Sequence, residues 1–450
     1  MSRARAAIIL AAGQGTRMRS ERPKVLHEVG GRPMIDWAIA AAKATGAERI
    51  VVVAGAHAPA FGVHVAKALG EQSIVIQDPP LGTAHAVRAA EDQLADFEGD
   101  AIILYGDAPL VPTERIEQMF ALQDANGGLV VLGFEARDAA GYGRIVQNNG
   151  IVERIVEDKD ASEAERAITL CNSGVLCADA RSLFQLLAQV RNDNVKGEYY
   201  LTDVVALGRA AGAATHVLVG EEDDALGVNS RAELAVAEAA FQRRVRRAAM
   251  ESGVTLIDPA SVYFSYDTEI EPDVVVEPNV FFGPGVKVRR GARIHAYCHF
   301  VHTEIGENAE IGPFARFRPG TRLGRMVKIG NFVEVKNSTF GEGAKANHLT
   351  YVGDADIGAR ANLGAGTITC NYDGFDKYRT TIGEDAFIGS DTSLVAPVKV
   401  GDRAYTGTGS VITKDVPDGA LAVARARQAN IDGWADANRA KKQKPTKDKA

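Results

Sequence analysis

Aliphatic residues recur at every sixth position over the second half of the chain, from about Ile270 to Val411. Each is followed by Gly or a small polar residue, and a small or β-branched residue usually stands fifth. The clearest pairs are Ile305-Gly306, Ile311-Gly312, Leu323-Gly324, Ile329-Gly330, Ile357-Gly358, Leu363-Gly364 and Ile388-Gly389. A period of six is typical of short parallel strands stacked into a β-solenoid, with the aliphatic side chain pointing inward.

A different pattern, apolar strands alternating with helical stretches, fills residues 1 to about 225. The strand candidates are Ala6–Leu10, Ile50–Ala54, Ser73–Gln77, Ala101–Tyr105 and Leu129–Gly133, and the helix candidates include Met34–Ala44, Thr83–Leu94 and Arg115–Gln123. This alternation predicts a mainly parallel, doubly wound α/β sheet. Such sheets bind ligands beyond the carboxyl ends of their strands.

One helix is predicted between the two halves, from Ser230 to Glu251, because Ser230 and Glu233 fit a capping box. We therefore expect a first domain over 1–226, a linker helix over 227–251, a solenoid domain over 252–422, and a C-terminal arm with a basic tail over 423–450. The repeat is interrupted from Thr369 to Thr380. A long loop thrown from a regular solenoid is often functional.

Composition narrows the class of protein. The chain has 450 residues, 46% of them hydrophobic and 24% charged, which suits two or three globular domains. The net charge of −7 argues against a nucleic-acid partner, and no segment is long enough for membrane insertion. Four cysteines without a CxxC pair favour a reducing, cytoplasmic location. We interpret the lysine-rich end, Arg439 to Ala450, as a disordered tail.

A glycine-rich loop follows the first strand and contains the first candidate chemistry. The segment Leu10-Ala11-Ala12-Gly13-Gln-Gly-Thr-Arg17-Met is followed by Pro-Lys24. Glycines let backbone N–H groups approach phosphate oxygens, and Arg and Lys add positive charge. Farther along, Tyr105-Gly106-Asp107 closes a strong strand. An aspartate there could hold Mg²⁺ or simply cap the following turn.

The string Gly-x-Gly-Thr-Arg-Met-x4-Pro-Lys resembles the sugar-nucleotide pyrophosphorylases, which join a nucleoside triphosphate to a sugar 1-phosphate and release pyrophosphate. The resemblance implies a Rossmann-like nucleotide-diphospho-sugar transferase domain, in which Arg17 and Lys24 assist phosphoryl transfer. It implies Asp107 and Asn229 as magnesium ligands, Gln77, Gly82 and Thr83 as the uracil segment, and Gly143, Glu157 and Asn172 as sugar-binding positions. Ala84 departs from the second Gly that the family often has.

The hexad repeat resembles the hexapeptide-repeat acyltransferases, which implies a left-handed parallel β-helix and a homotrimer. Within it, Arg318, Lys336, His348, Tyr351 and Asn362 resemble the sugar-phosphate site of the bifunctional N-acetylglucosamine-1-phosphate uridyltransferase/glucosamine-1-phosphate acetyltransferases. That resemblance spans nearly the whole chain. Acetyl transfer to an amine needs a base near neutral pH, and His348 is the candidate. Arg318 and Lys336 would hold the sugar phosphate as paired cations, and the alternative is that both belong to a solvated charged face.

The same resemblance implies an acetyl-CoA site at Ala365, Asn371, Tyr372, Ser390, Thr408 and Arg425. Thr408 replaces an alanine found in some relatives. A separate cluster, His295, Cys298, His299 and His302, contains residue types that bind zinc. Alternation along short strands would scatter these side chains over different faces, so we do not expect a metal site there.

The expected function is therefore a two-reaction enzyme. It would acetylate glucosamine 1-phosphate with acetyl-CoA and then transfer UMP from UTP to form UDP-N-acetylglucosamine, a precursor of peptidoglycan and lipopolysaccharide, with Mg²⁺ as cofactor. One alternative is a single-activity sugar-nucleotide pyrophosphorylase whose β-helix is structural or regulatory. Another is a non-enzymatic assembly scaffold, against which the intact segment from Gly13 to Lys24 argues.

Overall fold

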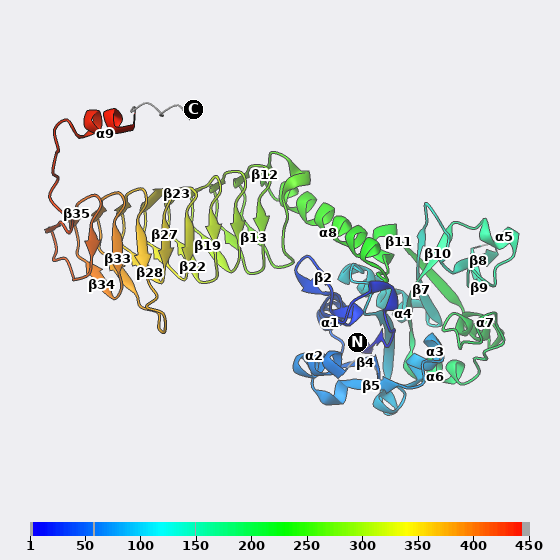
Figure 1. Cartoon of the computed structure of the whole chain (residues 1–450). Coiled ribbons are helices and arrows are strands. Elements are labelled where there is room, and N and C mark those ends of the chain that lie inside the picture. Colours follow the sequence, from blue (N-terminus) through cyan, green and yellow to red (C-terminus); the bar gives the residue numbers. More distant parts are fainter. Residues whose placement is uncertain (1–2, 57–58, 149, 443–450) are drawn as a thin grey trace, which may run out of the picture. The chain divides into compact units, whose positions relative to one another are not determined.

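The structure is a computed structural model that describes residues 3–56, 59–148 and 150–442 (Figure 1). The chain divides into two compact units. The first comprises residues 1–248 together with 264–266, and the second comprises residues 249–263 and 267–450. Each unit has its own architecture and its own candidate site.

The first unit is built on a sheet with the strand order β11-β7-β10-β6-β1-β4-β5. These strands are β1 (Ala4–Ala11), β4 (Arg49–Gly55), β5 (Ile74–Gln77), β6 (Gly99–Tyr105), β7 (Leu129–Glu135), β10 (Leu170–Asp179) and β11 (Thr215–Gly220). The predicted parallel pairing is confirmed for β1 with β4 and β6, but β10 runs antiparallel to β6 and β7. The chain enters β10 after an antiparallel pair, β8 (Arg144–Asn148) and β9 (Ile151–Val156), which explains the reversal.

Helices cover both faces of this sheet, and alternate residues of β1 belong to different hydrophobic clusters: Ile8 and Leu10 to one, Ala7 and Ile9 to the other. The helices are α1 (Met34–Ala44), α2 (Pro59–Leu69), α3 (Thr83–Arg88), α4 (Thr113–Asn126), α5 (Glu163–Arg166), α6 (Ala180–Leu187) and α7 (Asp203–Ala210), beside the small hairpin of β2 (Glu28–Val29) and β3 (Arg32–Pro33).

A single helix over Thr83–Leu94 was the wrong expectation. The α-helix ends at Arg88, and a separate 3₁₀ turn follows at Asp92–Leu94. Between them the bonds are of the i→i+3 type, such as the one from the Glu91 amide to the Arg88 carbonyl (3.0 Å). The tighter path accompanies the burial of Leu94 and Phe97 in the core, so tertiary packing overrides the local helical pattern.

The predicted helix after the first domain is confirmed as α8 (Arg231–Glu251). Its capping box is formed: the Glu233 amide donates to Ser230 Oγ (3.3 Å), and Glu233 Oε2 accepts from the Ser230 amide (3.0 Å). Later along the helix, the buried Gln242 amide donates to the Phe264 carbonyl (2.7 Å) and accepts from the Phe264 amide (2.9 Å). These two bonds fasten residues 264–266 to the first unit.

The second unit is a parallel β-helix, so the predicted solenoid is confirmed (Figure 1). One sheet contains β12 (Thr255–Leu256), β14 (Val275–Val276), β17 (Arg293–Ile294), β20 (Glu310–Ile311), β23 (Lys328–Asn331), β26 (Lys345–His348), β29 (Asn362–Leu363), β32 (Phe387–Ile388), β35 (Tyr405–Thr406) and β37 (Leu421–Ala422). The second contains β13 (Glu269–Ile270), β16 (Lys287–Val288), β19 (Thr303–Ile305), β22 (Thr321–Leu323), β25 (Thr339–Phe340), β28 (Ala355–Ile357), β31 (Thr380–Ile382) and β34 (Val398–Val400). The third contains β15 (Phe281–Phe282), β18 (His299–Phe300), β21 (Arg316–Phe317), β24 (Glu334–Lys336), β27 (Tyr351–Gly353), β30 (Ile368–Cys370), β33 (Ser393–Val395) and β36 (Val411–Ile412).

The aliphatic residue of each hexad stacks on its counterpart one coil away. Ile311 pairs with Ile329, for example, and both are buried. Between β30 and β31 the chain leaves the stack in the interrupting loop, which Figure 1 shows in gold. Glycine is required at Gly364, where a Cβ would lie 2.6 Å from the Ser390 backbone nitrogen of the next coil.

The C-terminal arm differs from the predicted disordered tail. A helix, α9 (Trp434–Lys442), covers the stretch from Arg439 to Lys442, and the remainder of that tail, 443–450, lies outside the described residues. Basic residues in the last turn of α9 suit the negative end of the helix dipole. Over the described part of the chain, no helix is both long and apolar enough to cross a membrane.

Candidate active sites

The glycine-rich loop lies at the carboxyl end of β1, and its hub is the Lys24 ammonium group. This group contacts the Asp107 carboxylate and donates to Asn229 Oδ1, which lies 2.9 Å from Nζ. The Lys24 side chain is only 8% exposed, so the charge is held in place rather than solvated. Gly15 has φ 64°, and a Cβ there would lie 2.6 Å from Lys24 Cβ, so this turn must be glycine.

Asp107 and Asn229 come from distant parts of the sequence but converge on Lys24. Asp107 follows β6, and Asn229 immediately precedes the capped start of α8, where its amide donates to Glu233 Oε2 (2.5 Å). One carboxylate and one amide oxygen form a donor set that suits a hard cation such as Mg²⁺, which takes its other ligands from phosphates and water. The chemistry of these two predicted ligands therefore fits the ion.

A cavity of about 280 Å³ beside this hub gathers most of the predicted nucleotide residues. Its lining includes Leu10, Ala11, Ala12, Gly13, Lys24, Gln77, Gly82, Thr83, Tyr105 and Asp107. Gln77 is buried and donates from Nε2 to the Gly82 carbonyl (3.0 Å), so part of its amide shapes the loop. Arg17 lies exposed on the short 3₁₀ turn Thr16–Met18.

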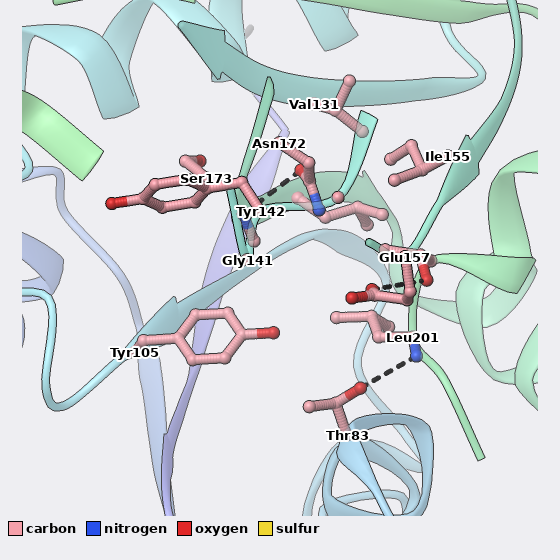
Figure 2. A pocket seen from close by; sticks show the side chains of 14 residues that line it. Thr83, Tyr105, Val131, Gly141, Tyr142, Ile155, Glu157, Asn172, Ser173 and Leu201 are labelled. Carbon is pink, nitrogen blue, oxygen red and sulfur yellow. Dashed lines mark hydrogen bonds between the residues drawn. The ribbon is translucent and has the colours of Figure 1, made fainter. Parts of the chain in front are cut away.

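A second cavity, of about 230 Å³, gathers the predicted sugar-binding residues (Figure 2). Gly143, Glu157 and Asn172 line it together with Thr83 and Tyr105, which also line the nucleotide cavity. In Figure 2, Tyr105 and Asn172 lie on opposite sides of the space and Glu157 lies at its edge. The two cavities are therefore neighbours that share a wall.

Glu157 is the acidic side chain that lines the sugar cavity. Burial raises the pKa of its carboxyl, and a hydrogen bond from Thr202 Oγ1 to Glu157 Oε1 (3.1 Å) opposes that rise. Burial, followed by repulsion from Glu157 and Asp160, raises the pKa of Asp203 to about 6. The Thr202 hydroxyl opposes the rise in the Glu157 pKa more than the Lys196 charge does, and sequence reasoning did not identify this residue.

A strap formed by residues 199–202 joins the two cavities. The Tyr199 amide donates to the Leu81 carbonyl (2.9 Å), and the Ala84 amide donates to the Tyr199 carbonyl (2.9 Å). The Leu201 amide donates to Thr83 Oγ1 (2.9 Å), as Figure 2 shows. The strap therefore fixes the predicted uracil segment against the wall that contains Thr202.

In the solenoid, the predicted phosphate ligands share one face. The pairing of β21 with β24 places Arg318 beside Lys336, and Lys336 Nζ lies 3.8 Å from Asp354 Oδ2. Lys377, from the interrupting loop, approaches Lys336 and is the main cause of the lowered pKa of Lys336. Burial lowers this pKa further, and the Asp354 carboxylate opposes the change. We call Arg318, Lys336 and Lys377 the cation cluster. Arg318 Nη1 pairs with Glu334 Oε1 (3.1 Å), and the two lysines lie near Asp354. Three cations beside two carboxylates leave one excess positive charge for an anion.

Sequence reasoning missed both Lys377 and Asp354. Burial would raise the pKa of Asp354, but hydrogen bonds from Asn337 (2.5 Å) and Asn371, together with the nearby lysines, lower it. Asp354 therefore stays ionised beside Lys336 and Lys377. No sequence period could reveal Lys377, because it lies in the loop that interrupts the repeat.

Tyr351 and Asn371 extend the same face. A Cβ at Gly353 would lie 2.4 Å from the Tyr351 hydroxyl and 2.8 Å from Asn371 Nδ2, so both polar groups lie directly over this glycine. Gly353 is the partner of Lys336 in the pairing of β24 with β27. Tyr351 is thus beside the cation cluster, whereas Asn362 lies on a different sheet opposite Lys345.

Four predicted residues, His348, Ala365, Ser390 and Thr408, occupy one corner position on successive coils, and we call them the donor column. Each step is marked by a backbone bond from the residue that follows: Gly366 to the His348 carbonyl (3.4 Å), Asp391 to Ala365 (2.7 Å) and Gly409 to Ser390 (2.8 Å). Arg425 Nη1 then donates to the Thr408 carbonyl (2.7 Å). The candidate base and most of the predicted acetyl-CoA residues therefore form one continuous line.

Some predicted residues lie apart from these groups. The Tyr372 side chain is 60% exposed, and its hydroxyl donates to the Gly374 carbonyl (2.6 Å) within the loop. The histidine and cysteine cluster does not converge: His295 lies between Glu277 (2.9 Å) and Glu310 (3.4 Å), whereas the His299 ring stacks on Phe281 with centroids 4.9 Å apart. Cys298 is buried.

Comparisons with known proteins cover both units. Residues 7–197 match the MobA-like NTP transferase domain, and residues 302–337 and 379–414 match the bacterial transferase hexapeptide (six repeats). The chain is 57% identical to the Bifunctional protein GlmU of Maricaulis maris over 98% of both chains. It is 55% identical to that of Caulobacter vibrioides, covering 98% of this chain and 96% of the relative, and 56% identical to that of Hyphomonas neptunium, covering 97% and 95%.

Proposed function

Because the chain belongs to the family of the bifunctional GlmU proteins, we propose which reaction each of its two units carries out. The family combines UDP-N-acetylglucosamine diphosphorylase and glucosamine-1-phosphate N-acetyltransferase activities, and the nucleotidyltransferase and hexapeptide domains follow in that order. The roles of the residues described above in each of the two reactions follow.

In the first unit, a phosphate oxygen of N-acetylglucosamine 1-phosphate attacks the α-phosphorus of UTP, and pyrophosphate leaves with the electron pair of the broken bond. Lys24 neutralises charge on the transferring group, and Arg17 adds a second positive charge from the loop. Glu157, Asn172 and Gly143 orient the sugar. Asp107 and Asn229 would hold Mg²⁺, which supplies positive charge to the phosphates.

In the second unit, the amine of glucosamine 1-phosphate attacks the acetyl-CoA carbonyl, His348 takes the amine proton, and the coenzyme A thiolate leaves. Arg318 and Lys336 hold the sugar phosphate, and Lys377 adds a third cation. Tyr351 and Asn362 orient the sugar. Ala365, Asn371, Tyr372, Ser390, Thr408 and Arg425 contact the coenzyme, chiefly along the donor column. The product is the acceptor of the first unit.

The observation that supports this assignment best is the pairing of a cation cluster with a donor column that begins at His348. A structural or regulatory β-helix would need neither. The alternative, a single-activity pyrophosphorylase, predicts no acetyl transfer. Coenzyme A release and pyrophosphate release, each measured with the purified chain with and without Mg²⁺, decide between them. Mg²⁺ removal should abolish only pyrophosphate release.

The assembly and setting belong to the same proposal. We expect a homotrimer built through the solenoids, a cytoplasmic location, and a role in supplying precursor for peptidoglycan and lipopolysaccharide. The working domain limits are 1–226, 227–251 for the linker helix, 252–422, and 423–450 for the arm. Light scattering of the full chain tests the trimer.

A further inference from the structure

Asn331 lies one step before the donor column and directly beside its first member. It is the last residue of β23, and the pairing with β26 places it opposite His348. The Leu349 amide donates to the Asn331 carbonyl (3.1 Å), the same backbone bond that marks each later step of the column. Asn331 therefore continues the line of His348 on the side away from Ala365.

The side chains of this pair also meet. Asn331 Oδ1 lies 3.0 Å from His348 Nδ1, a normal hydrogen-bond distance. An amide oxygen can only accept, so this contact requires the proton of His348 to be on Nδ1. The lone pair is then on Nε2, which is the form that a base needs if it works through that nitrogen.

The orientation of the amide suits both protonation states of the ring. When His348 takes a proton, Nδ1 still carries hydrogen and the bond to Oδ1 persists. If the Asn331 NH₂ group faced Nδ1 instead, it would stabilise the neutral ring with its proton on Nε2, where it blocks the base, and protonation of Nδ1 would break the bond. The observed arrangement therefore favours the imidazolium that forms during proton transfer.

Asn331 also lacks a charge, unlike the aspartate often found behind a catalytic histidine. The nearest charged side chains on the two strands, Lys328 and Lys345, stand three residues before Asn331 and His348, and Lys328 pairs with Glu310 (2.9 Å). A carboxylate at position 331 would place a negative charge beside the ring and favour its protonated form. The amide orients the ring without adding a charge.

We infer that Asn331 is a positioning residue of the acetyltransferase site, which fixes the ring and the tautomer of His348. This inference rests on the proposed role of His348 as the base. It assigns to Asn331 an effect on the rate of acetyl transfer that acts only through the histidine, with no contact to either substrate.

The test uses the full-length protein and four variants: N331A, N331D, H348A and N331A/H348A. Because a neutral hydrogen bond contributes about 0.5–1.5 kcal/mol, N331A should lower kcat for acetyl transfer about 2- to 13-fold with little change in either KM. N331D should retain acetyl transfer at high pH and move the acidic limb of its pH profile upward. In the H348A background, N331A should have no further effect.

Uridylyl transfer by the same preparations is the folding control, and all four variants should match the wild type. The inference is overturned if N331A keeps full kcat, if N331D leaves the acidic limb in place, or if N331A lowers the activity of H348A further. Those results leave the proposed function intact. Full acetyl transfer by H348A, in contrast, would remove the proposed base itself.

Discussion

Replacing Thr202 with valine tests the electrostatics of the sugar cavity. Valine has nearly the shape of threonine, so the change removes the hydroxyl that donates to Glu157 Oε1 (3.1 Å) and creates little or no cavity. A hydrogen bond to a charged group contributes about 1.5–3 kcal/mol. If the whole of this free energy is lost from the transition state for the sugar phosphate, kcat/KM for N-acetylglucosamine 1-phosphate should fall roughly 10- to 150-fold.

The pKa of Glu157 determines the direction in which the pH profile of T202V should move. Burial raises the pKa of Glu157 and the Thr202 hydroxyl opposes the rise, so its loss raises the pKa further. A larger fraction of Glu157 is then protonated near neutral pH. The acidic limb of the kcat/KM profile should therefore move to higher pH, and the deficit of T202V should shrink as the pH increases.

Pyrophosphate release, measured from pH 5.5 to 9 with each substrate varied in turn, provides the assay. T202S keeps the hydroxyl and should behave like the wild type, while the KM for UTP should stay within about threefold in both variants. Equal losses toward both substrates, or a T202V profile with an unmoved acidic limb, would refute the electrostatic reasoning. Matching melting temperatures exclude a general loss of structure.

Four further predictions follow from the same geometry. D107A should abolish pyrophosphate release while acetyl transfer, measured as coenzyme A release, persists, because its residues lie in the other unit. H348A should slow acetyl transfer about 10²- to 10⁴-fold and leave uridylyl transfer unchanged in the two assays. A fragment of residues 1–251 should be a monomer by light scattering and retain uridylyl transfer. It lacks Phe264, which hydrogen-bonds the buried Gln242, so its melting temperature should be lower than that of a fragment of residues 1–268. The pKa of Asp203 is about 6 in the folded protein and about 3.9 in the unfolded chain, so its ionised form destabilises the fold. D203N should therefore raise the free energy of unfolding by about 1–2 kcal/mol at pH 8, after discounting for solvent screening. Urea titrations should show that this gain vanishes below about pH 4.

The sequence predicted the elements whose pattern is local and periodic. The hexads gave the solenoid strands, and α1 begins and ends at the predicted residues, Met34 and Ala44. Direction was harder: the apolar pattern of β10 is the same whether it runs parallel or antiparallel to β6. The break after Arg88 depends on core packing that a window of sequence does not contain.

The candidate sites divide in the same way. Residues within recognisable strings, such as Lys24 and Asp107, could be predicted and do lie together. Thr202, Lys377 and Asn331 could not, because each matters through a contact with a residue far away in sequence. Thr202 meets Glu157 across 45 positions, and Lys377 reaches Lys336 only because its loop folds back.

The donor column also fixes the distances between its residues in steps of one coil. Adjacent strands are spaced by about 4.8 Å, so the three steps from His348 to Thr408 span roughly 14 Å, and no intermediate spacing is open to the fold. The donor column itself can be lengthened or shortened only by whole coils, since insertions such as the interrupting loop leave the stack. A coil gained before Asn331 would leave every distance along the donor column unchanged. A coil gained between His348 and Ala365 would move the candidate base about 4.8 Å farther from the residues that contact the acyl donor.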